Sequence, residues 1–266
     1  MNVMYTISTW LNRFSLILLA CSLPLWFMAC GGSDDGPGPD PDPDPVEDTT
    51  AVDNGMFYKL HRVENFAGDT EYDGPVDGKR AAIYFSLENK EGVKASYQKS
   101  NLWDLSFSGI ANSDIDVNNG SVRSSLGYGA TGVGAIYITD RSFEEVTDIP
   151  DESQFRYRVS LDENGAFGNG LGWALYDWGG EIVADASYEK QHVAYALGNP
   201  LTLNNGKNLV RTLVVKTAKG YYAKIKMISV YKDISDPENM MRNSTYPYFT
   251  FEYVLVPGDS ETFEIR

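Results

Sequence analysis

Apolar and polar side chains alternate along much of the chain from about residue 54 to its end. Over 155–161 every second residue is Phe, Tyr, Val or Leu, and over 249–255 every second residue is Phe, Tyr or Leu. A shorter run covers 103–107, where Trp, Leu and Phe alternate with Asp and Ser. A period of two turns one face of an extended segment toward a core, so each run predicts a half-buried β-strand.

A β-hairpin is predicted between two further apolar runs, 209–217 and 221–231. The short turn between them ends at Gly220, and glycine suits the positive-φ position that such a turn requires. Helix signals are few, but Ser142 and Glu145 fit a capping box and predict a short helix that ends before Pro150.

These patterns together predict one all-β domain over residues 55–266. We expect a mostly antiparallel β-sheet or sandwich with few short helices. No fixed-period repeat and no second linker divide this region.

The first 29 residues are predicted to be a lipoprotein signal peptide. Arg13 precedes an apolar run from Phe14 to Ala29, which is shorter than the about 20 residues of a comfortable membrane span. Cleavage before Cys21 would leave too short a hydrophobic region. Cys30 follows a region of proper length, has a small residue before it and is followed at once by polar residues. We therefore predict that Cys30 carries the lipid.

Residues 30–54 are predicted to link the lipidated cysteine to the domain. Between Gly31 and Val46, alternating Pro and Asp prevents helix formation, removes backbone donors and repels itself. At about 3.1 Å per residue this stretch spans roughly 50 Å. Cys30 and the acidic residues that follow Gly32 also resemble the export tag of surface lipoproteins of certain anaerobic Gram-negative bacteria. That resemblance implies a lipid anchor in the outer membrane, with the domain exposed at the cell surface.

Charge and composition exclude two classes of site. With 37 acidic and 22 basic residues, the net charge is −15, so no basic surface is available for nucleic acid. The two His and two Cys do not have the spacing of a Cys/His zinc site. Aromatic residues make up 13% of the chain, which suits both β-structure and stacking sites.

A glycine-rich segment has the letters of a nucleotide-binding motif without its context. Residues 127–132 spell G-x-G-x-x-G, but a strand-like sequence follows where a helix is needed to meet the pyrophosphate. We predict instead a flexible loop over 118–134 at the mouth of a sheet.

Three residues also resemble part of a calcium loop. Asp114, Asp116 and Asn118 have the right spacing, but Gly120 comes one residue late and Ser125 stands where Glu is required. The interpretation we prefer is a turn between strands.

No constellation of residues points to catalysis. A glycosidase needs two carboxylates facing each other across a cleft, and a serine hydrolase needs a nucleophile elbow, which the chain lacks. We expect no catalytic residues and no enzymatic activity. The acidic residues of this part of the chain are interpreted as solvated surface: Glu144, Glu145, Asp148, Asp151, Glu152, Asp162 and Glu163.

Four segments, in order and with matching spacing, carry a resemblance to a known family. They are YFSLENK at 84–90, WDLSF at 103–107 with Asn-Gly at 119–120, VVKTAKGYYAKI at 214–225, and TFEY at 250–253. Together they resemble the HmuY family of surface lipoproteins that bind heme. The similarity covers about residues 55 to 257.

The resemblance implies an all-β fold whose loops at one end hold heme between two axial side chains, which are His in some members and Met in others. It also implies that heme is passed to a TonB-dependent receptor in the outer membrane. Heme or a related tetrapyrrole is therefore the expected ligand, with no metal beyond the heme iron.

Few side chains of the domain are suitable axial ligands, because heme iron takes His, Met, Cys or Tyr. His192 lies in the region where the family places one ligand, although the aligned position falls nearer Tyr195 or Ala196. The region of the other ligand, 166–178, contains neither His nor Met, and Tyr176 is the nearest donor there.

Two thioethers are the alternative donors. Met240 and Met241 lie in a polar loop and are the remaining axial candidates, whereas Met227 is expected to pack in the core and His61 to be a strand residue. The pocket is expected to combine aromatic rings that cover the porphyrin with a lysine for its propionates: Trp173, Tyr176, Trp178, Tyr195 and Lys190.

An alternative hypothesis keeps the fold and changes the ligand. Trp103, Trp173 and Trp178 are aromatic platforms that stack on sugars as readily as on porphyrin. On this hypothesis the protein binds a glycan or another surface protein.

Overall fold

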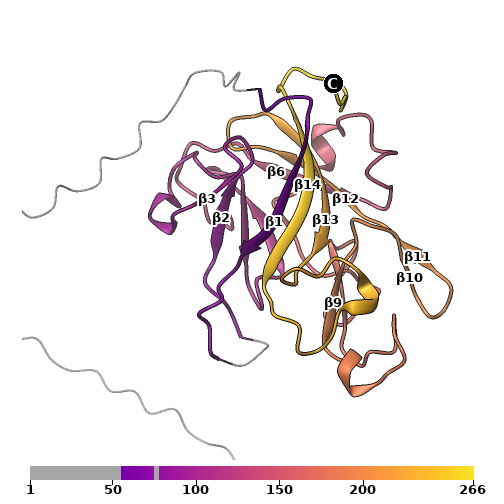
Figure 1. Cartoon of the computed structure of the whole chain (residues 1–266). Helices are drawn as coiled ribbons and strands as arrows, with labels where there is room; N and C mark the ends of the chain where they lie inside the picture. Colours follow the sequence, from indigo (N-terminus) through magenta and orange to yellow (C-terminus); the bar gives the residue numbers. More distant parts are fainter. Residues whose placement is uncertain (1–54, 75–77) are drawn as a thin grey trace, which may run out of the picture. The chain divides into compact units, whose positions relative to one another are not determined.

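The computed structural model describes residues 55–74 and 78–266, which form an all-β unit (Figure 1). The predicted signal peptide at 1–29, the linker at 30–54 and the lipidation site at Cys30 lie outside the described residues. The all-β prediction is confirmed: the described part contains antiparallel sheets and only short 3-10 turns. These turns are η1 (Ala95–Tyr97), η2 (Glu152–Gln154), η3 (Tyr188–Lys190) and η4 (Pro237–Asn239).

The first sheet has five strands and contains the long C-terminal hairpin. In sheet order its members are β1 (Leu60–Ala67), β14 (Tyr248–Val256), β13 (Tyr222–Ser229), β12 (Thr212–Lys216) and β6 (Ala135–Thr139). The predicted hairpin is confirmed, since β12 pairs with β13 and Gly220 has a φ of +90° in the turn between them. His61 lies in β1 as expected, and Met227 in β13 is 2% exposed and packs in the core.

The second sheet also has five strands, and two small two-stranded sheets complete the fold. The second sheet is, in order, β3 (Glu91–Val93), β2 (Ile83–Ser86), β4 (Leu105–Ser108), β5 (Asp114–Val117) and β7 (Arg158–Val159). The small sheets pair β8 (Ala174–Asp177) with β9 (Val193–Ala196), and β10 (Leu201–Thr202) with β11 (Asn208–Leu209).

The two large sheets pack against each other through aromatic rings. Phe107 of the second sheet stacks on Phe249 of the first, with ring centroids 3.9 Å apart. Phe85 meets Phe251 edge to face at 5.3 Å. All four rings are at most 1% exposed. The alternation over 249–255 therefore encodes the core of a sandwich, and buried rings of this size dominate its packing energy.

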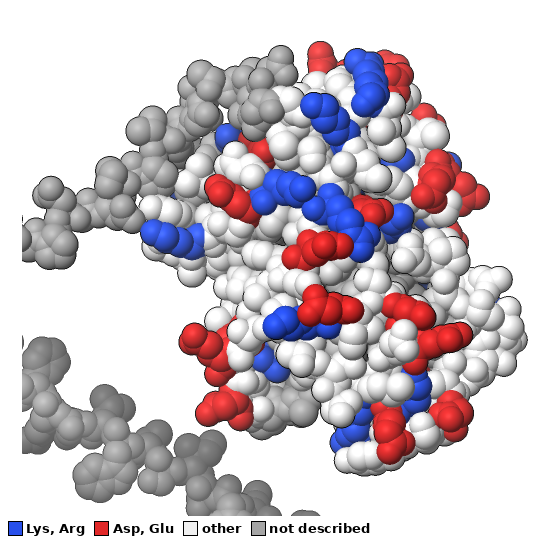
Figure 2. Space-filling view, viewed as in Figure 1, with Lys and Arg blue, Asp and Glu red and all other residues white. Residues whose placement is uncertain are grey.

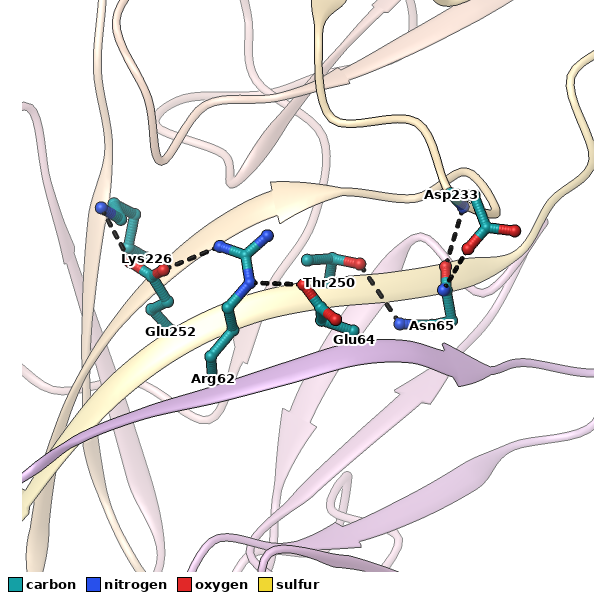
Figure 3. Close-up of polar contacts among 7 residues, drawn as sticks. All are labelled: Arg62, Glu64, Asn65, Lys226, Asp233, Thr250 and Glu252. Carbon is teal, nitrogen blue, oxygen red and sulfur yellow. Dashed lines mark hydrogen bonds and ion pairs between the residues drawn. The ribbon is translucent and has the colours of Figure 1, made fainter.

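The outer face of the first sheet is polar in one part and apolar in another, where Val214, Val254 and Val256 pack in a second hydrophobic cluster. Arg62 of β1 donates to Glu252 of β14 at 2.8 Å, and Lys226 of β13 lies 3.0 Å from the same carboxylate (Figure 3). Side chains of both signs are intermixed on the face that Figure 2 shows. A β-bulge interrupts β1 at Asn65, whose side-chain amide donates to Asp233 at the start of the β13–β14 loop, at 2.7 Å (Figure 3).

Three expectations about local structure need correction. The capping-box contacts form, with Ser142 N donating to the Glu145 carboxylate at 2.8 Å, but only a single turn follows and no helix develops. Asp114 and Asp116 lie within strand β5 and not in a turn. The Asp116 carboxylate accepts from Arg158 of the neighbouring strand at 2.6 Å, so its partner is a guanidinium.

Asp162 is buried and is not part of the solvated surface that its sequence context predicts. Its side chain is fully buried, and Arg211 Nε donates to it at 2.9 Å. The glycine-rich segment 127–132 is a loop that leads to strand β6, as predicted. Within the described ranges, no helix has the length and apolar character needed to cross a membrane.

Candidate functional site

A cavity of about 410 Å³ opens beside the β8–β9 hairpin. Its volume lies in the range typical of small-molecule sites, about 300–1,000 Å³. Its walls come from the β4–β5 loop, the segment before β8, both strands of the hairpin, and the β13–β14 loop with its flanking strands. The lining residues are Ile110, Ala111, Asn112, Ser113, Leu161, Phe167, Trp173, Ala174, Tyr176, Trp178, His192, Ala194, Val230, Tyr231, Arg242, Tyr246 and Phe249.

The hairpin presents its cavity side chains by simple alternation. Ala174, Tyr176 and Trp178 line the cavity, while the residues between them face the other way. Tyr176 is paired with Ala194 in the antiparallel register, so His192, two residues earlier, is opposite Trp178. The backbone N–H of His192 donates to the Trp178 carbonyl at 3.2 Å. The turn between the strands is held by buried Asp177, which accepts from the backbone N–H groups of 181, 182 and 183.

Two donor side chains meet in the cavity. The Tyr176 hydroxyl lies 3.0 Å from Nδ1 of His192, within hydrogen-bonding distance. The His192 ring also packs against the edge of Trp178, with ring centroids 4.5 Å apart. Burial and the nearby positive charge of Arg242 lower the pKa of His192, so its imidazole is neutral at pH 7 and keeps a nitrogen lone pair. The two sequence regions in which the axial ligands are expected therefore lie side by side, at the paired strands β8 and β9.

Aromatic rings make up most of the apolar wall. Trp173 is 2% exposed, and its Nε1 donates to the Ser113 carbonyl at 2.7 Å, which fixes the ring at the base of the cavity. Phe167 and Trp178 lie at the rim, 75% and 51% exposed, and meet edge to face at 5.5 Å. Apolar rings exposed in this way form a surface on which a flat ligand can stack.

The other predicted site residues lie elsewhere. Met240 is 1% exposed and packs in the main core, and neither it nor the half-buried Met241 lines the cavity. Tyr195 points to the opposite side of β9, and its burial raises the pKa of its hydroxyl to about 12. The Lys190 ammonium donates to the carbonyls of Glu238 and Met240, so it holds the β13–β14 loop against η3.

Of the lining residues, sequence reasoning named only Trp173, Tyr176, Trp178 and His192, and those it missed include Tyr231 and Arg242. Tyr231, two residues after β13, accepts a hydrogen bond from Ala194 N at 2.9 Å, and burial raises the pKa of its hydroxyl. Arg242 follows the methionine pair that was considered for iron and is the cavity's only Lys or Arg among the described lining residues. Its position directly after Met241, in a loop already considered for the site, is the sequence feature that could have identified it.

The described cavity offers the His192 imidazole and the Tyr176 phenol hydroxyl as possible metal donors. Among the described residues no group of three or more His, Cys, Asp or Glu side chains is placed to hold a metal ion. One neutral imidazole and one phenol in an apolar, aromatic cavity suit a ligand that brings its own equatorial donors, such as a metalloporphyrin.

Comparison with known proteins identifies the family. The family model described as HmuY protein matches residues 79–253. The chain belongs to the HmuY family. The matched HmuY segment includes every described residue that lines the cavity. HmuY proteins are binding proteins, so the chain is a HmuY-type binding protein.

Solved structures also resemble the HmuY domain. The apo HmuY analog of Tannerella forsythia is 14% identical, with a TM-score of 0.34, covering 75% of this chain and 95% of its own. A Bacteroides fragilis protein named as a "putative lipoprotein" is 14% identical, with a TM-score of 0.28, covering 76% of this chain and 91% of its own. No curated protein matches the sequence.

Proposed function

We propose that this protein binds heme or a related tetrapyrrole in the cavity beside β8 and β9. The observation that carries the proposal is the His192–Tyr176 pair, 3.0 Å apart, within an aromatic cavity of a HmuY-family domain. His192 supplies the nitrogen ligand for iron. Because Nδ1 faces Tyr176, Nε2 is the nitrogen left for the metal.

The walls of the cavity match the rest of the ligand. Trp173 and Tyr176 cover an apolar ring system from inside, and Phe167 and Trp178 extend this surface at the rim. Burial of a porphyrin face against these rings favours binding, since apolar burial contributes about 25 cal/mol per Å². We further propose that the protein is a lipid-anchored surface protein that passes the ligand to a TonB-dependent outer-membrane receptor.

A hemin titration followed by visible absorbance tests the proposal. The purified protein is expected to show a saturating, one-to-one change in the Soret band. His192→Ala is expected to lower the affinity about tenfold or more, equal to about 1.4 kcal/mol, and to change the spectrum. His61→Ala is the matched control, because His61 lies in β1 and bonds to the Met56 carbonyl away from the cavity.

A second variant tests the methionines. Met240→Leu with Met241→Leu removes both thioethers and conserves the core volume that Met240 fills, and it is expected to keep the spectrum of the bound form, because neither residue lines the cavity. Absence of a Soret change with the wild-type protein would contradict heme binding altogether. Loss of the spectrum only in the methionine variant would contradict the assignment of His192.

The alternative ligand, a glycan or a surface protein, has narrower support. Trp103 is fully buried and Trp173 is 2% exposed, so these rings do not form an exposed platform. Only Trp178, together with Phe167, remains available at the rim for stacking on a sugar.

A further inference from the structure

The cavity holds one cation that no side chain of residues 55–74 or 78–266 neutralises. Arg242 lines the cavity, and within the described part of the chain its guanidinium makes no ion pair. None of the described lining residues is Asp or Glu. A guanidinium left without a carboxylate beside an apolar cavity is a ready partner for an anionic group, because it presents paired N–H donors in a planar fork.

Neighbouring contacts hold this cation in place. The backbone N–H of Arg242 donates to the Glu189 carbonyl at 2.7 Å, and the guanidinium lies over the Tyr188 ring at 4.5 Å. Lys190 lies in the same 3-10 turn, η3, as Tyr188 and Glu189. Its ammonium donates to two carbonyls of the β13–β14 loop and is therefore already hydrogen-bonded within the protein. Because the guanidinium stacks on a ring and none of the described carboxylates pairs with it, its N–H edge remains available to a ligand.

The acidic net charge of the whole molecule makes the positive charge of Arg242 important for binding an anionic ligand. The net charge is −15, so the protein as a whole repels an anionic ligand. A local cation that faces an anionic group offsets this repulsion and makes the binding of that group more favourable. Arg242 and the neutral His192 are the only His, Lys or Arg residues among the described lining residues.

We propose that the cavity selects a ligand with a flat apolar body and a carboxylate at its edge, and that Arg242 binds this carboxylate. The inference rests on the proposed function and makes it more specific: a tetrapyrrole is held at a propionate as well as at its metal. The carboxylate lies toward the β13–β14 loop, and the apolar body lies against Trp173 and Tyr176.

Hemin and its dimethyl ester separate carboxylate recognition from ring binding, because the ester keeps the iron and the ring and removes both negative charges. In Soret titrations, the wild-type protein is expected to bind hemin about tenfold more tightly than the ester. Arg242→Gln is expected to weaken hemin binding by about the same factor and to leave ester binding unchanged, so that the preference disappears.

Arg123→Gln is the matched control, since Arg123 is exposed and does not line the cavity. Equal binding of hemin and ester by the wild-type protein would overturn the inference alone, and so would a preference that survives in Arg242→Gln. Failure of the wild-type protein to bind either ligand would overturn the proposed function and this inference with it. The comparison of ligands on the wild-type protein does not depend on how well the variant folds.

Discussion

Asp162 shows how far the environment of one residue can depart from its sequence context. It lies in a polar stretch, yet its carboxylate is fully buried and accepts from Asn164 N at 3.0 Å, Gly172 N at 3.1 Å and the Arg211 guanidinium. Burial raises the pKa of Asp162, but these hydrogen bonds and the Arg211 charge outweigh it, so the net pKa is lowered. The pair closes the loop over 162–172 that carries Phe167 to the cavity rim.

Arg211→Met is expected to destabilise the protein by about 3–5 kcal/mol, because it leaves a buried carboxylate without its counter-charge. Urea unfolding followed by circular dichroism measures the change. The control is Arg62→Met, which removes the ion pairs to Glu64 and Glu252 of a side chain that is 42% exposed and should cost at most about 1 kcal/mol. Similar decreases in the free energy of unfolding for both variants would show that Arg211 does not stabilise the buried Asp162 carboxylate.

At the scale of elements, Asp104 ties the two large sheets together. It precedes β4, and its carboxylate accepts from Leu87 N after β2 at 2.7 Å and from Ala218 N in the β12–β13 turn at 2.9 Å. Burial, together with the nearby charge of Glu88, raises the pKa of Asp104 to about 7. Protonation therefore favours the folded state, since an unfolded aspartate titrates near pH 3.9.

The stability contributed by protonated Asp104 is present at acidic pH and is lost as the pH rises through about 7. Asp104→Asn is expected to remove this component, which urea midpoints at pH 5 and pH 8 detect. His192, whose pKa is lowered, makes stability rise with pH in the same window, so the readout is the difference between variant and wild type. Exposed Asp151→Asn is the control, and a wild-type trend retained in Asp104→Asn would contradict the assignment.

At the scale of the whole molecule, the sequence predicts different tasks for the binding domain and for the segment that precedes it. The sandwich positions the cavity, and the Pro- and Asp-rich segment over 31–46 has the composition of an extended spacer. The function that we propose needs both, because a receptor at the cell surface can take the ligand only from a domain held nearby. The membership in the HmuY family concerns the domain, and the anchor stays a prediction from the sequence.

Metabolic labelling with a palmitate analogue in a Gram-negative host tests the anchor. The full chain is expected to incorporate the label and to fractionate with the outer membrane. Cys30→Ser is expected to abolish both, whereas Cys21→Ser is expected to keep both, because only cleavage at Cys30 leaves a hydrophobic region of full length. Labelling that is lost in Cys21→Ser would move the lipidation site.

The sequence by itself determined the class of the fold and much of its core. Alternation of apolar and polar residues indicates which side of a strand is buried. The buried face of β14, the turn at Gly220 and the core position of Met227 could therefore be predicted from the sequence. The likeness to the HmuY family rests on the same strand motifs, because they carry the packing of the sandwich.

Only the tertiary structure decided how the site is assembled. The pairing of β8 with β9 brings Tyr176 to His192, and the docking of the β13–β14 loop on η3 places Arg242 at the cavity while Met240 turns into the core. Local alternation contains no information about which strands pair or which loops meet, since these depend on contacts between residues distant in sequence. Burial of polar groups such as Asp162 follows the same rule, because a carboxylate can be buried only where the fold supplies its donors.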